Sequence, residues 1–198
     1  MTPVHPGPVL LPGASTPAGP VRRRDPVRRR DPVLPADPAV TVLVGAPASG
    51  KSSLRRRLVD AGLPPSRVVC LDDLRHAARA VAGDPSRRLQ DFSVAAVRAA
   101  AALQAELLAA GHGYVSDATN LRRRERVAHV RSARAAGLPA LALLFPALPV
   151  EELAARDRLR PPGERVPVDV LAAFAHRRSL LSRDLLLGEG FDAVHEVG

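Results

Sequence analysis

The sequence predicts an α/β fold in which a five-stranded, mainly parallel sheet is flanked by helices. From Val40 onward, short apolar segments rich in β-branched residues alternate with longer helical patterns, as parallel strands joined by crossover helices require. The first segment, residues 40–44, runs directly into a glycine-containing loop, and a helical pattern follows the loop. A buried strand, a glycine loop and a helix N-terminus together form an anion-binding unit.

The individual elements follow from the hydrophobic pattern and from the residues that end it. Apolar runs typical of buried parallel strands cover residues 40–44, 67–71, 113–116, 140–145 and 191–197. Helical patterns cover residues 51–61, 73–82, 88–110, 121–136, 149–160 and 167–188. Gly111 and Gly137 end two of these patterns, because glycine adopts the left-handed conformation at little cost. Ligands of parallel sheets bind at the carboxyl ends of the strands, so polar residues just after each strand are the candidate site.

The chain divides into a tail, residues 1–38, and a domain, residues 39–198. The tail is rich in Pro and Arg and contains a tandem repeat over residues 21–26 and 27–32. It offers little to bury, so we expect disorder, either as a basic arm that attracts nucleic acid or as a solvated linker. The second part is long enough to form one domain with a hydrophobic core.

Composition narrows the function classes. A formal net charge of +9 favours a polyanionic partner. Four Phe, one Tyr and no Trp are too few for an extended platform that stacks many bases. The single cysteine, Cys70, excludes an internal disulfide framework. No apolar run reaches the length of a membrane span, so we expect a cytoplasmic protein without a membrane partner.

The glycine loop carries the strongest chemical signal, because residues 45–52 match the phosphate-binding pattern G-x-x-x-x-G-K-[ST]. Lys51 of this motif is the only lysine of the chain. Its compact ammonium acts as a point charge on β- and γ-phosphate oxygens, a task that a planar guanidinium does not perform. The Ser52 hydroxyl is placed to bind Mg²⁺. The residues expected to bind ATP or another NTP are Gly45, Ala46, Pro47, Ala48, Ser49, Gly50, Lys51, Ser52 and Ser53.

Acidic residues follow the second and third predicted strands. Asp72 and Asp73 come after the second strand and Asp117 after the third, so parallel pairing brings them to the edge that holds the glycine loop. A carboxylate there can accept the proton of an incoming hydroxyl, and Arg75 can hold an anionic acceptor by a bidentate contact. Asp117 has the position of a Mg²⁺-side carboxylate. The structural alternatives are helix caps, formed by one of the first two aspartates and by residues 119–120.

Arginines cluster in two further places. Arg156 and Arg160 lie four residues apart and precede a Pro/Gly-rich loop, which is typical of a lid, placed at residues 156–167, that closes over a triphosphate. Their charges suit the transferring phosphoryl group. Residues 122–126 hold four arginines at a predicted helix start. A solvated helix face is the favoured interpretation there, and contact with phosphates is the alternative.

These motifs resemble the P-loop 5′-hydroxyl polynucleotide kinases of phage and bacterial nucleic-acid repair, within the wider group of small P-loop kinases of the AAA and zeta-toxin type. The matching elements occur in the family's order: the P-loop, Asp-Asp-x-Arg at 72–75, Asp-x-Thr-Asn at 117–120, Arg-x-x-x-Arg at 156–160, and Val-Pro-Val-Asp-Val-Leu at 166–171. The resemblance implies a kinase-type P-loop NTPase fold with a helical lid. It also implies that Asp72 is the general base for the 5′-OH, that Arg75 contacts the acceptor's 3′-phosphate, and that the two lid arginines bind donor phosphates.

The predicted function is therefore ATP-dependent transfer of a γ-phosphoryl group to a hydroxyl, with the 5′-OH end of a nucleic acid as the expected acceptor. The expected catalytic residues are Lys51, Asp72, Arg75, Arg156 and Arg160, and the expected Mg²⁺ ligands are Ser52 and Asp117. Two alternatives stay open: a P-loop kinase of a small metabolite, antibiotic or nucleotide sugar, and a regulatory module that binds nucleotide without transfer. Asp72 favours an enzyme over such a module, because a pure switch needs no base for a substrate hydroxyl.

Overall fold

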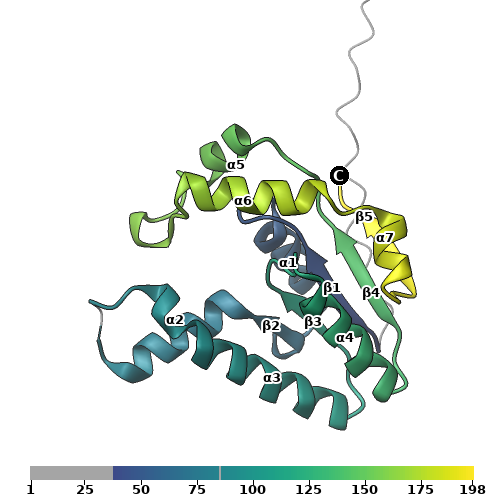
Figure 1. Cartoon of the computed structure of the whole chain (residues 1–198). Coiled ribbons are helices and arrows are strands. Elements are labelled where there is room, and N and C mark those ends of the chain that lie inside the picture. Colours follow the sequence, from purple (N-terminus) through teal and green to yellow (C-terminus); the bar gives the residue numbers. More distant parts are fainter. Residues whose placement is uncertain (1–37, 85) are drawn as a thin grey trace, which may run out of the picture. The chain divides into compact units, whose positions relative to one another are not determined.

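Within residues 38–84 and 86–198, which the computed structural model describes, five strands form one sheet in the order β2-β3-β1-β4-β5 (Figure 1). The strands are β1 (Val40–Val44), β2 (Val68–Cys70), β3 (Tyr114–Asp117), β4 (Ala140–Leu144) and β5 (Ala193–Glu196). All neighbouring strands are parallel, so the predicted α/β fold is confirmed and this sheet is parallel throughout. The disorder predicted for the tail falls on residues 1–37, which lie outside the described residues.

Two of the predicted helical patterns are divided in the structure, and the others agree to within a few residues at their ends. The helices are α1 (Lys51–Asp60), α2 (Leu71–Ala82), α3 (Ser93–Ala109), α4 (Arg123–Ala135), α5 (Val150–Asp157), α6 (Val168–Ser179) and α7 (Arg183–Gly188), with 3₁₀ turns η1 (Pro65–Arg67), η2 (Leu89–Phe92) and η3 (Pro162–Glu164). The pattern over 88–110 starts as η2 before it becomes α3. The pattern over 167–188 is two helices, because the Ser182 side chain accepts a hydrogen bond from Leu185 N and so caps α7.

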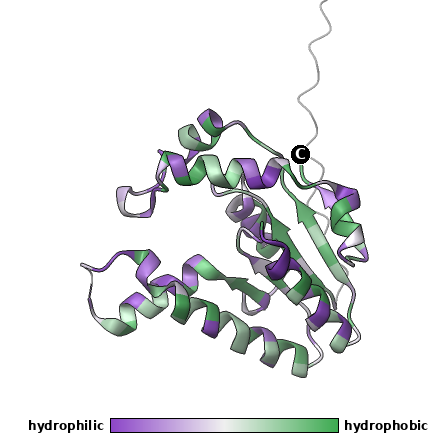
Figure 2. Cartoon of the chain, viewed as in Figure 1, coloured by the Kyte–Doolittle hydropathy of each residue, from purple (hydrophilic) through white to green (hydrophobic). Residues whose placement is uncertain are grey.

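Helices cover both faces of the sheet, and the alternation of side chains along β1 divides the core in two. Val40, Val42 and Val44 belong to one hydrophobic cluster, which α3, α4 and α7 complete. Leu43 belongs to the other cluster, which Leu54 and Leu58 of α1 complete. Strands β1 and β4 are therefore largely hydrophobic (Figure 2). Burial on both faces is the reason that these strands appear in the sequence as continuous apolar runs.

One helical segment of the described chain, Leu89–Ala109, is long and apolar enough by length and composition to cross a membrane. This differs from the expectation that no apolar run reaches that length, because alanines raise the mean hydropathy of α3. Its most apolar 18-residue window is 17% buried. Length and composition alone are weak evidence for a membrane role.

Buried polar groups hold the segment between β3 and α4. Asn120 Nδ2 donates to Leu43 O at 2.9 Å, which ties this segment to β1, and the residue has a φ of 48°. Arg126 is 2% exposed and donates to both carboxylate oxygens of Glu189, at 2.6 and 2.7 Å. The capping role suggested for residues 119–120 is therefore wrong, since α4 follows Arg122 without a side-chain cap. The solvated helix face predicted for the arginine cluster is wrong for Arg126.

A histidine of α4 closes a second polar cluster against β3. His129 Nδ1 lies 2.9 Å from the Tyr114 hydroxyl, and its Nε2 lies 3.2 Å from Ser116 Oγ. Burial lowers the pKa of His129 to about 4, because the surroundings disfavour the charged imidazolium.

We expect this histidine to make the fold sensitive to acid. An unfolded histidine has a pKa near 6.5, so between that pH and about 4 the unfolded state binds more protons, and stability falls as the pH is lowered. Urea unfolding at pH 7.5 and 4.5 should show that His129 lowers the free energy of unfolding by about 2–3 kcal/mol between the two pH values. His129→Gln should flatten the pH dependence by that amount, whereas His176→Gln, at an exposed position of α6, should leave it unchanged. An unaltered slope in His129→Gln would contradict the assignment.

Candidate functional site

The loop between β1 and α1 curls around the Lys51 ammonium. Lys51 Nζ donates to Gly45 O at 3.0 Å and to Ala46 O at 2.6 Å, and the side chain is buried. Ala48 and Gly50 have φ values of 60° and 105°, and this left-handed backbone gives the loop its tight curvature. The loop is thus built around a desolvated cation rather than being a simple turn.

Gly45 is required at the start of this loop for steric reasons. A Cβ added there would lie 2.7 Å from Phe145 Cβ and 2.7 Å from Ser49 Oγ. Phe145 directly follows β4, and Arg178 of α6 donates from Nε to its carbonyl oxygen. The glycine loop therefore packs directly against the carboxyl end of β4.

Three charged groups act on Lys51 from different elements. Burial lowers the pKa of Lys51 to about 8, and Asp117 and Asp72 oppose this shift, while Arg160 adds to it. The structure therefore places four predicted site residues close enough for their charges to interact: the P-loop lysine, a carboxylate of β3, a carboxylate of α2 and an arginine of the predicted lid.

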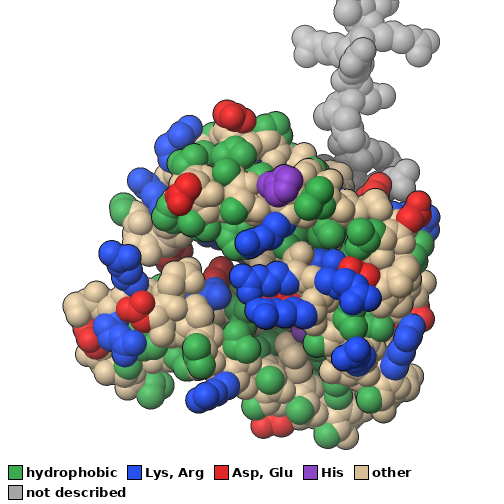
Figure 3. Space-filling model, in the orientation of Figure 1, with side chains coloured by type: hydrophobic (Ala, Val, Ile, Leu, Met, Phe, Trp, Pro, Cys, Tyr) green, Lys and Arg blue, Asp and Glu red, His purple; other side chains and the backbone are tan. Residues whose placement is uncertain are grey.

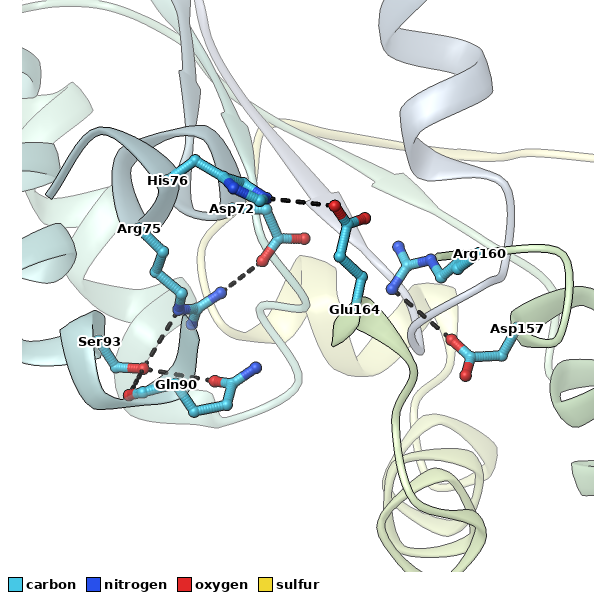
Figure 4. Close-up of polar contacts among 8 residues, drawn as sticks. All are labelled: Asp72, Arg75, His76, Gln90, Ser93, Asp157, Arg160 and Glu164. Atoms are coloured by element: carbon cyan, nitrogen blue, oxygen red, sulfur yellow. Dashed lines mark hydrogen bonds and ion pairs between the residues drawn. The ribbon is translucent and has the colours of Figure 1, made fainter. Parts of the chain in front are cut away.

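Asp72 lies in the first turn of α2 rather than in a loop after β2. Cys70 is the residue before this helix and no side chain caps it, so the expected helix cap by Asp72 or Asp73 is wrong. Both carboxylates instead lie where the helix dipole favours negative charge. Arg75 Nη1 donates to Asp72 Oδ1 at 2.5 Å, and its Nε donates to Ser93 Oγ at 3.1 Å (Figure 4). The start of α3 therefore orients Arg75, which in turn holds Asp72.

The sequence analysis missed Arg55, which lies between two carboxylates. Its Nη1 donates to Asp73 Oδ2 at 2.7 Å, and its Nε lies 3.5 Å from Asp117 Oδ2. Burial raises the pKa of Asp117, and Lys51 and Arg55 oppose the rise. A sequence signal existed, because Arg55 lies four residues after Lys51 and so shares its face of α1.

The donor set at this edge suits Mg²⁺. The Ser52 hydroxyl and the Asp117 carboxylate are hard oxygen ligands, and Mg²⁺ is commonly held by one or two such groups together with substrate phosphates. The buried position of Asp117, with its raised pKa, marks a carboxylate that gains from a nearby cation. Among the described residues, no group of three or more His, Cys, Asp or Glu side chains is arranged to hold a metal by itself. The site thus fits an ion that arrives with a nucleotide.

The two predicted lid arginines differ in their surroundings. Arg156 donates to Glu152 Oε1 at 2.6 Å, and both side chains are 44% exposed. Arg160 lies beyond the end of α5, where its charge acts on Lys51. Its Nη1 is 3.6 Å from Asp157 Oδ1. The structure thus brings Arg160 near the P-loop, whereas Arg156 contacts Glu152 of its own helix.

The segment between α5 and α6, which is the predicted lid, is anchored at its base and touches α2 at its tip. Asp157 is 3% exposed, and its Oδ2 accepts a hydrogen bond from Val166 N at 2.8 Å. Glu164 Oε1 lies 3.5 Å from His76 Nε2 of α2 (Figure 4). A hollow separates the α2 side of the molecule from the α5–α6 side, and acidic side chains are visible within it (Figure 3). The P-loop edge is therefore reached between α2 and the lid.

Comparison with known protein families agrees with this geometry. The family described as AAA domain matches residues 40–181. The chain belongs to this family. The match covers the P-loop, α2 and the lid, and with the parallel sheet it establishes a kinase-type P-loop fold. The expected relation to the small P-loop kinases is thereby confirmed at the level of fold and family. No match was found among curated protein sequences.

Solved structures share the fold at low sequence identity. The crystal structure of AvrRxo1-ORF1:-ORF2 with ATP matches with a TM-score of 0.57 and 18% identity, over 76% of this chain and 50% of that chain. The same complex with sulphate ions gives a TM-score of 0.55 and 19% identity, over 69% and 46% of the two chains. This chain thus spans about half the length of those relatives. A gluconokinase from Sinorhizobium meliloti 1021 has 24% identity over 81% of this chain and 83% of that chain, with a TM-score of 0.49.

We expect Arg55 to stabilise the apo site through its carboxylates. Arg55→Gln leaves Asp117 with less compensation for its burial and should lower the free energy of unfolding by about 1–2 kcal/mol at pH 7.5. In an Asp117→Asn background the same change should cost less, because the amide carries no charge. Arg56→Gln, at an exposed position of the same helix, is the control and should be neutral in urea unfolding. Equal losses in both backgrounds would show that Arg55 acts through other contacts.

Proposed function

We propose that the chain is an ATP-dependent kinase that transfers the γ-phosphoryl group to an alcohol hydroxyl. The observation that carries the proposal is the placement of Lys51 and Asp72 in the first turns of α1 and α2, which follow the carboxyl ends of two parallel strands of the same sheet. A buried ammonium there suits the phosphates of the donor, and a carboxylate suits the hydroxyl of an acceptor. A nucleotide-binding module without a transfer reaction has no need of the second group.

Each residue then has a definite task. Lys51 and the backbone of residues 45–53 bind the donor phosphates, while Ser52 and Asp117 would hold Mg²⁺. The metal, when bound, neutralises charge on the phosphates. Asp72 accepts the hydroxyl proton as the oxygen attacks the γ-phosphorus, and the bond to the bridging oxygen breaks so that ADP leaves. Arg160 balances the charge that develops on the phosphoryl group.

The acceptor that we propose is the 5′-OH of a nucleic acid. Arg75 is fixed by Ser93 beside Asp72, so a phosphate that contacts Arg75 would leave an adjacent hydroxyl near the base. The net charge of +9 favours a polyanionic acceptor over a neutral metabolite. Arg156 is proposed as a donor-phosphate ligand only in a closed lid, in which it would have to leave Glu152.

The transfer reaction is tested with γ-labelled ATP and a mixture of a 5′-OH oligonucleotide and small alcohol metabolites. We expect label on the oligonucleotide 5′ end. Lys51→Ala should reduce the rate by about 10²–10³, the scale of losing one group that stabilises charge in the transition state. Arg56→Ala removes an exposed cation from the same helix and should retain the parental rate. Near-parental turnover in Lys51→Ala would count strongly against the proposal, and label on a metabolite alone would identify a small-molecule kinase.

Asp72 should be needed for transfer but not for nucleotide binding. Asp72→Asn should keep the affinity for ATP, measured by calorimetry, while the transfer rate falls by about 10²-fold or more, because the amide accepts no proton. The neighbouring change Asp73→Asn is a matched control, since Asp73 is engaged with Arg55. Equal loss of binding and transfer in Asp72→Asn would mean that the residue is structural.

A further inference from the structure

A cavity of about 440 Å³ opens beside the second half of α2. It is lined by His76, Arg79, Ala80, Gly83 and Asp84. His76 and Arg79 follow Asp72 by four and seven residues, so the three side chains share one face of the helix. The cavity therefore continues the surface on which Asp72 lies.

Arg79 brings a positive charge to this cavity, and no described residue forms an ion pair with it. In residues 38–84 and 86–198 its guanidinium has no ion-pair or hydrogen-bond partner. One turn earlier, by contrast, Arg75 is paired with Asp72. The carboxylate at the cavity, Asp84, accepts hydrogen bonds from Ser86 N at 3.0 Å and Ser86 Oγ at 2.5 Å, which offset its charge locally. A half-buried guanidinium that is not paired with a carboxylate is suited to an anionic ligand.

The lid contact borders the same cavity. His76, which lines the cavity, is the residue that Glu164 of the lid approaches at 3.5 Å. Figure 4 shows Glu164 on the lid side facing His76 and Asp72 of α2. An anion bound at Arg79 would therefore lie near a lid carboxylate that repels it and competes for His76.

We propose that this cavity binds a second anionic group of the acceptor, one that lies beyond the phosphate held at Arg75. Arg79 follows Asp72 by seven residues, a rise of about 10 Å along α2. An acceptor that fits both positions has a hydroxyl at one end and a phosphate about 10 Å away. This inference rests on the proposed kinase function and narrows the acceptor to an extended chain with at least two phosphates.

The test compares two acceptors, of which only the longer one carries this second phosphate. Thymidine 3′-monophosphate has one phosphate next to its 5′-OH, and the trinucleotide TpTpT has a second phosphate farther along. Arg79→Gln should raise KM for TpTpT about tenfold, as expected for the loss of one charge-assisted hydrogen bond. It should leave KM for the monophosphate and kcat for both acceptors unchanged.

Arg98→Gln is the matched control, because it removes an exposed arginine of α3 that does not line the cavity. Its KM values should equal those of the parent protein. If Arg79→Gln changes KM for both acceptors equally, or for neither, the inference is overturned while the kinase function stands. Transfer to neither acceptor by the parent protein would overturn the proposed function as well as the inference.

Glu164→Gln supplies a test in the opposite direction. Removing the lid carboxylate should lower KM for TpTpT by about two- to fivefold, since exposed charge interactions of this kind contribute up to about 1 kcal/mol. KM for thymidine 3′-monophosphate should not change. A raised KM for both acceptors would indicate loss of lid structure. That outcome, like an unchanged KM for TpTpT, would contradict competition between Glu164 and the second phosphate.

Discussion

The site depends on the cost of burying one ammonium group. Lys51 lies among backbone carbonyls with little access to water, and desolvation lowers its pKa to about 8. Such a cation persists in the folded protein only where negative charge lies nearby. Asp117 supplies it because β1 and β3 pair in parallel, with Val42 opposite Ser116, and this register puts the next residue of β3, Asp117, beside the end of β1 that leads into the P-loop. The buried Lys51 ammonium thus depends on the strand register, because the register places the carboxylate that compensates its charge.

The carboxylates around Lys51 are balanced in turn by arginines. Arg55 contacts Asp73 and Asp117, Arg75 contacts Asp72, and Arg160 approaches Asp157. In the ligand-free arrangement, positive and negative groups therefore alternate across the sheet edge. A triphosphate adds several negative charges to a site whose arginines are already paired. Its binding therefore requires either an accompanying cation or a rearrangement of these pairs.

The sequence was sufficient for the fold and for part of the site because those features have local signals. Strand β1 coincides with the predicted residues 40–44, since a strand buried on both faces is continuously apolar. The P-loop also follows from local spacing, whereas Arg55 was missed although it lies four residues after Lys51. The partners of Arg126 and Asn120 could not be predicted from local spacing. Glu189 lies 63 residues from Arg126 in the chain, and Leu43 lies 77 residues from Asn120. Similarly, Asp72 resembles a helix cap in sequence, and only the start of α2 at Leu71 shows that it lies inside the first turn.

The lid links the two sides of the site through very few residues. Arg160 acts on Lys51 of the P-loop, and Glu164, four residues later, contacts His76 on the side that we propose for the acceptor. The base of this segment is fixed, because the buried carboxylate of Asp157 accepts a hydrogen bond from Val166 N. Because Arg160 and Glu164 are only four residues apart in this anchored segment, a change in the contacts of one is close in the chain to the contacts of the other. The same short segment therefore borders both the P-loop and the cavity beside α2.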